Sequence, residues 1–169
     1  MQSKEGEKYN NAMYYNLLPE WVAGFSTGES NFFITVQNSK TKSGLSVWLR
    51  FSIGQHSRDH LLLESLVNFF GCGYVVKYEK REVCEFIVTK IDHIILHIIP
   101  FFDKYPIIGS KCLNYLNFCK AANIIKNKEH LNIDGKGLEQ ILQLKAGTPS
   151  ACEAGEGISI VASSQSTQR

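Results

Sequence analysis

The stretch LLPEWVAGFSTGESNFFITV, residues 17–36, predicts a short helix that runs directly into a β-strand. Pro19 suits the first turn of a helix, because its ring presets φ and its missing N–H would be unpaired there. From Phe32 to Val36, every second residue is aliphatic or aromatic, which is the period-two pattern of a strand with one buried face. We therefore expect the helix to end at about Gly28, immediately before this strand.

Two glycines and one acid distinguish this helix. Gly24 and Gly28 are four residues apart, so they share a face on which a second backbone can come very close. The apolar run is too short to cross a membrane, and we expect this face to pack against another helix in water. Glu29 follows at the C-terminal end, where the helix dipole disfavours an anion. An acid in that place indicates a cation nearby.

The rest of the pattern predicts an α+β fold with the element order αββαββα plus an extra helix at its C-terminal end. Four strands with one apolar face need helices over that face, and they leave the other face free and, if antiparallel, concave through twist. Helical spacing of isoleucines indicates a buried helix that ends at Pro100. We expect strands over 32–37, 46–53, 74–78 and 83–89, and helices over 58–70, 91–99, 109–126 and 134–147.

Composition is consistent with one folded domain. The 169 residues, 44% of them hydrophobic, supply one ordinary core. We expect a flexible N-terminus over 1–12, the domain over 13–147, and a disordered tail over 148–169. The formal charge of +2 permits binding of nucleic acid through a local patch but does not identify a partner.

Cysteine and histidine spacing argues against a structural metal or disulfide framework. The five cysteines include no C-x-x-C pair, which fits a reducing compartment. The pairs His56/His60 and His93/His97 have helical spacing but no third ligand spaced with them, so we expect ordinary histidines. The first residues have neither a secretory h-region nor an Arg-rich, acid-poor composition, so a protein that works in an organelle would have been made there.

The free face of the predicted sheet carries hydrogen-bonding side chains on its first two strands. Such side chains can contact base edges in a major groove that accommodates a β-ribbon. A simple solvated face is the alternative, but Phe33 and Trp48 on a wet surface favour a partner. With basic residues in the turns, the expected contact set is Phe33, Thr35, Gln37, Lys40, Lys42, Ser46, Trp48, Arg50, Ser52, Lys77, Lys80 and Arg81.

Residues 22–30, VAGFSTGES, resemble the signature helix of the LAGLIDADG homing endonucleases. The likeness continues through LRFSIGQH, EFIVTK, IPFFDKYP and KNKEHL, which look like segments of fungal mitochondrial intron-encoded members. It covers residues 17 to about 147 and is closest to the C-terminal half of two-motif members. This chain departs from the family pattern at three positions. Relatives commonly have an acid where Thr27 stands, a glycine where Ser30 stands and an acid where Asn117 stands.

The resemblance implies the LAGLIDADG fold and a role for three residues. In that family two signature helices pack together, and the acid at the eighth position of each binds a catalytic divalent metal, here Mg²⁺ or Mn²⁺. Glu29 occupies that position. By the same similarity, Gln55 corresponds to a polar residue that orients active-site water, and Lys111 to a basic residue near the scissile phosphate.

A chain with one signature helix is expected to form a homodimer, with Ala23, Gly24 and Gly28 at the interface. The resemblance then implies a mitochondrial, organelle-encoded endonuclease that cleaves a long, near-palindromic double-stranded DNA site, with no membrane partner. The alternative is a decayed family member that binds intron RNA as a maturase or ribosomal RNA as a ribosome-associated component. The three departures favour that alternative, and the retained catalytic trio opposes it. A scaffold or small enzyme unrelated to nucleic acid is a third possibility.

Overall fold

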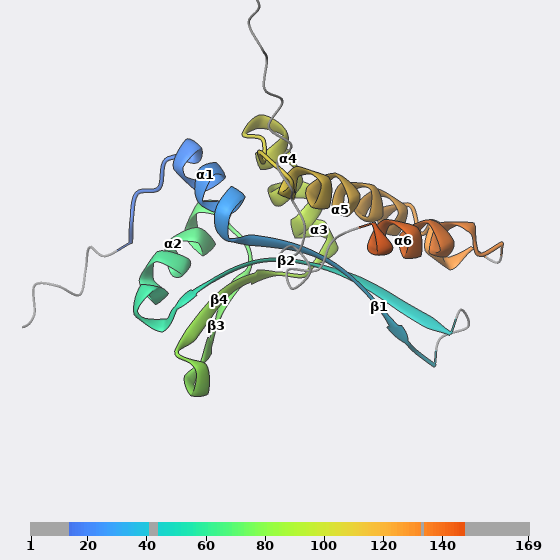
Figure 1. Cartoon of the computed structure of the whole chain (residues 1–169), viewed down its shortest axis with the longest axis horizontal. Helices are drawn as coiled ribbons and strands as arrows, with labels where there is room; N and C mark the ends of the chain where they lie inside the picture. Colours follow the sequence, from blue (N-terminus) through green and yellow to red (C-terminus); the bar gives the residue numbers. More distant parts are fainter. Residues whose placement is uncertain (1–13, 41–43, 133, 148–169) are drawn as a thin grey trace, which may run out of the picture.

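A four-stranded antiparallel sheet, curved like an arch and covered by helices on its convex side, forms the framework of the protein (Figure 1). The computed structural model describes residues 14–40, 44–132 and 134–147. The expected flexible N-terminus and tail, and Lys42, lie outside these residues. The strands are β1 (Ser30–Asn38), β2 (Leu45–His56), β3 (Tyr74–Tyr78) and β4 (Val83–Val88), in the order β1-β2-β4-β3.

The helices follow the predicted order, so the expected α+β fold class is confirmed. They are α1 (Pro19–Glu29), α2 (His60–Phe70), α3 (Ile91–His93), α4 (Ile99–Lys104), α5 (Lys111–Lys126) and α6 (Lys136–Ala146). Short turns of tighter or wider helix join them: η1 (Ser57–Asp59), η2 (Glu79–Arg81), η3 (Ile94–Ile98) and η4 (Glu129–Leu131). In the described part of the chain, no helix is long and apolar enough to span a bilayer.

A cluster of aromatic rings holds the helices against the sheet. The Phe51 ring on β2 lies 5.1 Å from Phe32 on β1, 6.2 Å from Phe70 on α2, 6.2 Å from Phe86 on β4 and 5.6 Å from Phe102 on α4, between ring centroids. The Phe32 pair is tilted and the other three are edge-to-face, and edge-to-face pairs add roughly 0.5–1.5 kcal/mol each beyond the burial of their area. The core therefore joins three strands and two helices through one residue.

The helix predicted to end at Pro100 instead continues to Lys104. Residues Ile94–Ile98 wind as a π-helix between α3 and α4. A proline inside an α-helix loses one backbone hydrogen bond, and its ring clashes with the carbonyl four residues earlier. The wider π turn just before Pro100 changes that hydrogen-bond pattern, so the chain passes the proline without ending the helix.

Strand β2 also runs further than its sequence pattern indicated. We expected it to end at Gly54, yet Gly54 pairs with Glu85 and His56 pairs with Val83 on β4. The β-ladder continues because β4 supplies partners on that side for these last residues. This extension places Gln55 inside the sheet, at the end nearest α1, because Ser30 directly after α1 pairs with Ile53 on β2.

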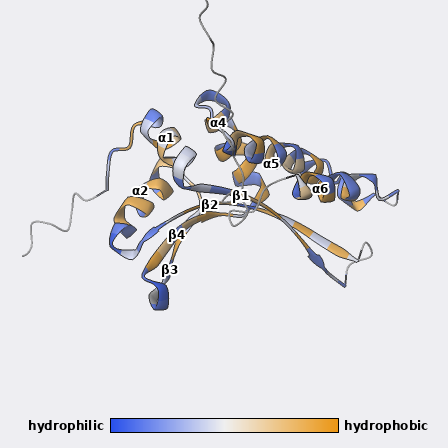
Figure 2. Cartoon of the chain, in the orientation of Figure 1, coloured by the Kyte–Doolittle hydropathy of each residue, from blue (hydrophilic) through white to orange (hydrophobic). Residues whose placement is uncertain are grey.

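Among the described residues, no helix covers the concave face of the sheet (Figure 1). On it, Phe33 pairs with Arg50 and Thr35 pairs with Trp48 between β1 and β2. Hydrophobic residues concentrate along the strands, and the η2 tip is hydrophilic (Figure 2). This uncovered face, which we call the concave face, is the one on which the sequence predicted binding.

Candidate functional site

The three residues assigned catalytic roles by resemblance meet at the C-terminal end of α1. Gln55 Nε2 donates a hydrogen bond to Glu29 Oε2 at 3.1 Å. Lys111 Nζ donates to the carbonyl oxygen of Gly28 at 2.7 Å, one residue before the acid. They come from α1, the end of β2 and the first turn of α5, so the fold brings together residues far apart in the sequence.

Lys111 has an altered environment. Partial burial lowers the pKa of its ammonium below the usual 10.5, and the negative charge of Glu29 opposes that shift. The first effect is the larger one, so the lysine is a somewhat easier proton donor than a surface lysine. The influence of Glu29 also means that acid and cation act on each other electrostatically.

The position of Glu29 is fixed by the junction between α1 and β1. Glu29 is the last residue of the helix, and Ser30 is both its cap and the first residue of the strand. The Ser30 side chain is buried, and its Oγ donates to the Ser26 carbonyl at 2.5 Å. Glu29 is exposed, so its carboxylate faces solvent from a rigid support.

Thr27 is a supporting residue that the sequence marked only as a departure from the family pattern. Its Oγ1 donates to the Ala23 carbonyl at 2.9 Å and accepts a long 3.5 Å hydrogen bond from the Ile108 N–H. Ile108 lies three residues before Lys111. Thr27 therefore links the acid-bearing helix to the segment that leads into the lysine.

One face of α1 is open. A Cβ atom built on Gly24 or Gly28 would meet nothing within 4 Å. Beside them, Trp21 and Phe25 stack at 4.8 Å between ring centroids, and Trp21 is 43% exposed. A partly exposed aromatic pair next to two exposed glycines is a surface suited to close contact.

Ala23 does not belong to this open face. We expected it at the dimer interface, but it is buried with Val22 and Ser26 on the side of α1 that packs on the protein. Adjacent helix positions point about 100° apart, so Ala23 and Gly24 cannot both lie at the centre of one contact. The expected interface set is corrected to the two glycines.

The concave face collects most of the predicted nucleic-acid contacts. The β1 and β2 residues among them alternate onto it as expected, and Lys80 and Arg81 lie exposed in η2 at the hairpin tip. Two members need correction. Ser52 is fully buried, so it is withdrawn from solvent, and Lys77 pairs with the buried Cys84, which puts it on the helix-covered side.

Two residues on the concave face were missed by the sequence analysis. Glu85 on β4 forms an ion pair with Arg50 on β2, and Tyr78 Oη on β3 donates to Glu85 Oε2 at 3.2 Å. No local sequence signal marks Glu85, because an acid in an alternating strand is usually solvated. Its partner became visible only with the strand order, which places β4 beside β2.

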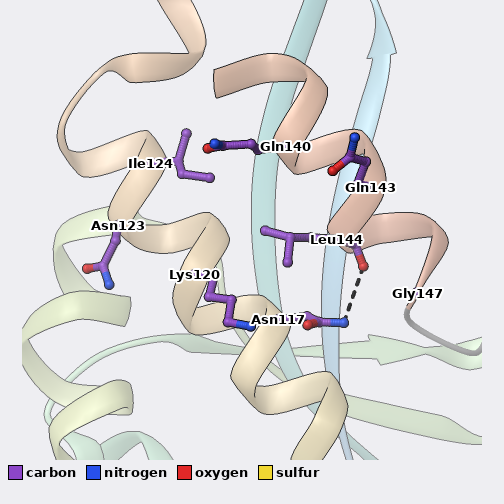
Figure 3. A pocket seen from close by; sticks show the side chains of 8 residues that line it. All are labelled: Asn117, Lys120, Asn123, Ile124, Gln140, Gln143, Leu144 and Gly147. Atoms are coloured by element: carbon purple, nitrogen blue, oxygen red, sulfur yellow. Dashed lines mark hydrogen bonds between the residues drawn. The ribbon is translucent and has the colours of Figure 1, made fainter. Parts of the chain in front are cut away.

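Asn117 contributes to packing at a distance from the trio. Its Nδ2 donates to the Leu144 carbonyl at 3.4 Å and so connects α5 with α6 (Figure 3). A pocket between these helices is lined by amide side chains, including Asn123, Gln140 and Gln143. It lies along the later turns of α5, whereas Lys111 is the first residue of that helix, so the pocket is separate from the acid.

The donor set around Glu29 fits a hard divalent cation that is shared with other ligands. Among the described residues, no group of three or more His, Cys, Asp or Glu side chains could hold a metal ion. Mg²⁺, however, is commonly bound by only one or two carboxylates together with water and substrate phosphates. The exposed Glu29 carboxylate at the open end of α1 suits that mode and not a closed protein cage.

An antiparallel sheet that helices cover on its convex side, with an acid at the end of the first helix, defines an α+β module. The family model described as LAGLIDADG endonuclease matches residues 22–122. The chain belongs to the LAGLIDADG endonuclease family.

Relatives and solved structures agree with this assignment. "Probable intron-encoded endonuclease 2" of Neurospora crassa is 60% identical over 79% of this chain and 28% of that protein. A protein in ND4 intron 1 of Podospora anserina is 32% identical over 67% of this chain and 25% of that protein. The homing endonuclease I-LtrWI bound to its target DNA is 43% identical, with a TM-score of 0.76 over 80% of this chain and 45% of that one. I-SmaMI bound to cleaved DNA is 41% identical, with a TM-score of 0.74 over 78% of this chain and 44% of that one.

The chain is shorter than the proteins it matches. It spans about a quarter of the two fungal relatives and less than half of each solved endonuclease. The properties of those whole proteins are therefore considered for this chain only as proposals.

Proposed function

We propose that this chain is a site-specific, divalent-metal-dependent DNA endonuclease module, with DNA held on the concave face and cut beside Glu29. The observation that carries the proposal is the hydrogen bond from Gln55 to Glu29, with Lys111 bonded to the adjacent carbonyl. These groups sit at the end of α1, where the helix surface is open. Neighbouring structures bound to DNA support double-stranded DNA as the partner.

Each residue of the trio has a distinct task in phosphodiester hydrolysis. Glu29 would hold the metal, which when bound polarises a phosphoryl oxygen and lowers the pKa of water. Gln55 orients the Glu29 carboxylate through its amide and can hold a water without changing charge. Lys111 carries a positive charge next to the acid, where it stabilises negative charge that develops on the phosphate.

A complete site needs a second acid, because each strand of the duplex has its own scissile phosphate. We propose that a second copy of the chain supplies it, by contact of two α1 helices at Gly24 and Gly28. In a longer polypeptide, a second module would take that place. A homodimer would favour a near-palindromic target, whereas two different modules would not require one.

The introns in which relatives occur bear on the origin of this chain. A relative occurs in an ND4 intron and another in a cox1 intron, which supports an origin in a mitochondrial intron. The maturase alternative predicts binding of intron RNA that does not depend on Glu29. The preserved contact between Glu29 and Gln55 favours the nuclease, since an RNA-binding protein has no need of it.

The test is cleavage of duplex DNA that carries the intron-insertion site of the host gene, in Mg²⁺ and with the full chain. Glu29→Gln should lower the cleavage rate at least about a hundredfold, because it removes several kcal/mol of charge stabilisation. The affinity of the Glu29→Gln variant for DNA should remain close to that of the original protein. Glu20→Gln, an exposed acid in the first turn of the same helix, is the matched control and should cut normally. Equal cutting by Glu29→Gln, or binding of intron RNA alone, would reject the nuclease proposal.

A further inference from the structure

One connected group of side chains crosses all four strands on the concave face. Arg50 on β2 forms an ion pair with Glu85 on β4, and Tyr78 on β3 donates to the same Glu85 oxygen, Oε2, at 3.2 Å. On the other side, the Arg50 guanidinium carbon lies 6.0 Å from the ring centroid of Phe33 on β1. Arg50 is thus held from two directions, by a charge and by an aromatic ring.

The ion pair lies flat on the sheet. Glu85 is opposite Gly54, four residues further along β2 than Arg50, and Ser52 sits between them on the same face. The arginine must therefore extend along β2 past Ser52 to meet Glu85, and Ser52 is fully buried. The two charged side chains are only 25% and 16% exposed. They form part of the floor of the concave face and do not project from its rim.

This ion pair has no net charge and is mostly buried, so it is poorly suited to binding phosphate. The carboxylate next to the guanidinium repels an anion. Lys40, Lys80 and Arg81, by contrast, are exposed near the strand ends, where they are better placed to contact phosphate. Donors beside an acceptor instead match the edge of a base pair. In the major groove, guanine presents the acceptors O6 and N7, and its paired cytosine presents the N4 amino donor.

We propose that Arg50 and Glu85 together recognise one G·C base pair, with Arg50 donating to guanine and Glu85 accepting from cytosine N4. The inference rests on the proposed function, since it needs DNA on the concave face. Tyr78 is a positioning residue, because its hydroxyl holds the Glu85 carboxylate. Phe33 keeps the guanidinium plane in place. The guanidinium has five N–H donors, so its bond to Glu85 leaves donors for a base.

The experiment measures sequence preference with the full chain. Duplexes randomised through the bound site are selected for binding and then for cleavage, and the base preference at each position is compared between variants. The original protein should prefer G·C at one position of the half-site by roughly ten- to a hundredfold. Arg50→Gln should abolish this preference. Glu85→Gln should reduce it at least about fivefold, and Tyr78→Phe should reduce it less, with all other positions unchanged.

Controls separate a base contact from loss of folding or of charge. Arg58→Gln removes an exposed arginine in η1, outside the four strands of the sheet, and should leave every preference intact. Thermal unfolding identifies a variant that does not fold, and if Glu85→Gln is one, the single-hydroxyl change Tyr78→Phe decides. A base contact also leaves the salt dependence of binding nearly unchanged, whereas a lost phosphate contact lowers the slope by about one.

The outcomes distinguish this inference from the proposed function. If the original protein selects and cuts specific DNA but Arg50→Gln and Glu85→Gln retain its full base preference, the paired recognition is wrong and the nuclease stands. If Arg50→Gln weakens binding equally on all sequences and lowers the salt slope, Arg50 contacts phosphate and the inference also fails. If the original protein selects no DNA sequence, both proposals fall together.

Discussion

The amide of Gln55 donates to the carboxylate of Glu29 at 3.1 Å and so joins the end of β2 to the end of α1. The contact exists because β2 continues past Gly54 and pairs with β4 to its last residues. An amide can fix the direction of a carboxylate without adding charge to it. The relationship gives the candidate site its geometry, and it makes Gln55 the most informative residue to change after Glu29.

Replacing Gln55 tests whether this orientation matters for cleavage. Gln55→Ala should slow cleavage by roughly ten- to a hundredfold, because one positioned donor beside the reacting groups is lost. DNA affinity, measured by fluorescence anisotropy in Ca²⁺, should change little. Gln140→Ala, an exposed glutamine on α6, should cleave at the original rate. A Gln55→Ala protein that cuts at full speed would contradict the assigned role.

Lys111 should give cleavage an alkaline limit. Burial lowers its pKa from 10.5, so its positive charge is lost as pH rises through a range below that value. Cleavage should decline with that charge, and Lys111→Arg should remove the decline, because arginine stays protonated. The control variant Lys126→Arg, at the end of α5, should still show the decline of cleavage at high pH. The pH dependence of single-turnover rates is the measurement.

The same shift also has a defined effect on stability. The folded state releases the Lys111 proton at a lower pH than the unfolded chain does, so burial of the charged form costs stability at neutral pH. That cost should shrink as pH rises through the window below 10.5. Relative to Lys111→Met, the original protein should therefore gain stability in urea unfolding across that window. A constant difference between the two proteins would contradict the shift.

A substitution at Gly24 should distinguish the stability of the single chain from the association of two chains. A Cβ atom at this position would meet nothing within 4 Å in the described part of the chain, and replacing a helix glycine favours the helix by up to about 1 kcal/mol. Gly24→Leu should thus fold at least as well but associate more weakly, as measured by sedimentation equilibrium. Asn68→Leu, at an exposed position on α2, is the control for added apolar surface. Unchanged association of Gly24→Leu, or a strictly monomeric original protein, would reject the helix-to-helix contact.

Gly73 and Gly71 form a matched pair for stability. Both have positive φ, +87° and +65°, but a Cβ on Gly73 would lie 2.6 Å from Phe86 Cε2 and 2.8 Å from the Ile87 oxygen. A Cβ on Gly71 would meet nothing within 4 Å. Gly71→Ala should cost about 1 kcal/mol from backbone strain, and Gly73→Ala at least about 2 kcal/mol more from the clash. Equal costs in urea unfolding would contradict the local packing.

Much of the fold could be predicted because alternation and helical spacing are local properties. Phe32 and Ile34 are buried as expected, and the order of elements follows from such patterns. The errors arose where neighbouring elements decide the outcome. Pro100 is a helix breaker by itself, but the π turn before it depends on the surrounding packing, and Gly54 ends a strand only if no partner continues beside it.

The site was predicted less completely than the fold. Catalytic roles for Glu29, Gln55 and Lys111 were predicted through the family resemblance, since no spacing rule connects residues on three separate elements. The burial of Ser52 could not be predicted from the alternation of its strand, because it depends on neighbouring strands whose pairing the sequence did not determine. Glu85 was missed for the same reason: its partner lies on a strand whose place in the sheet the sequence did not determine.

The absence of any loop between α1 and β1 has a mechanical consequence. The last helical residue carries the acid, and the next residue already belongs to the edge strand of the arch. If DNA binds on the concave face as proposed, a duplex that bends this strand would also tilt the carboxylate at its end. A poorly matched sequence could then be bound without correct alignment of the Glu29 carboxylate. The DNA target would be selected twice, once at binding and once at alignment of the acid.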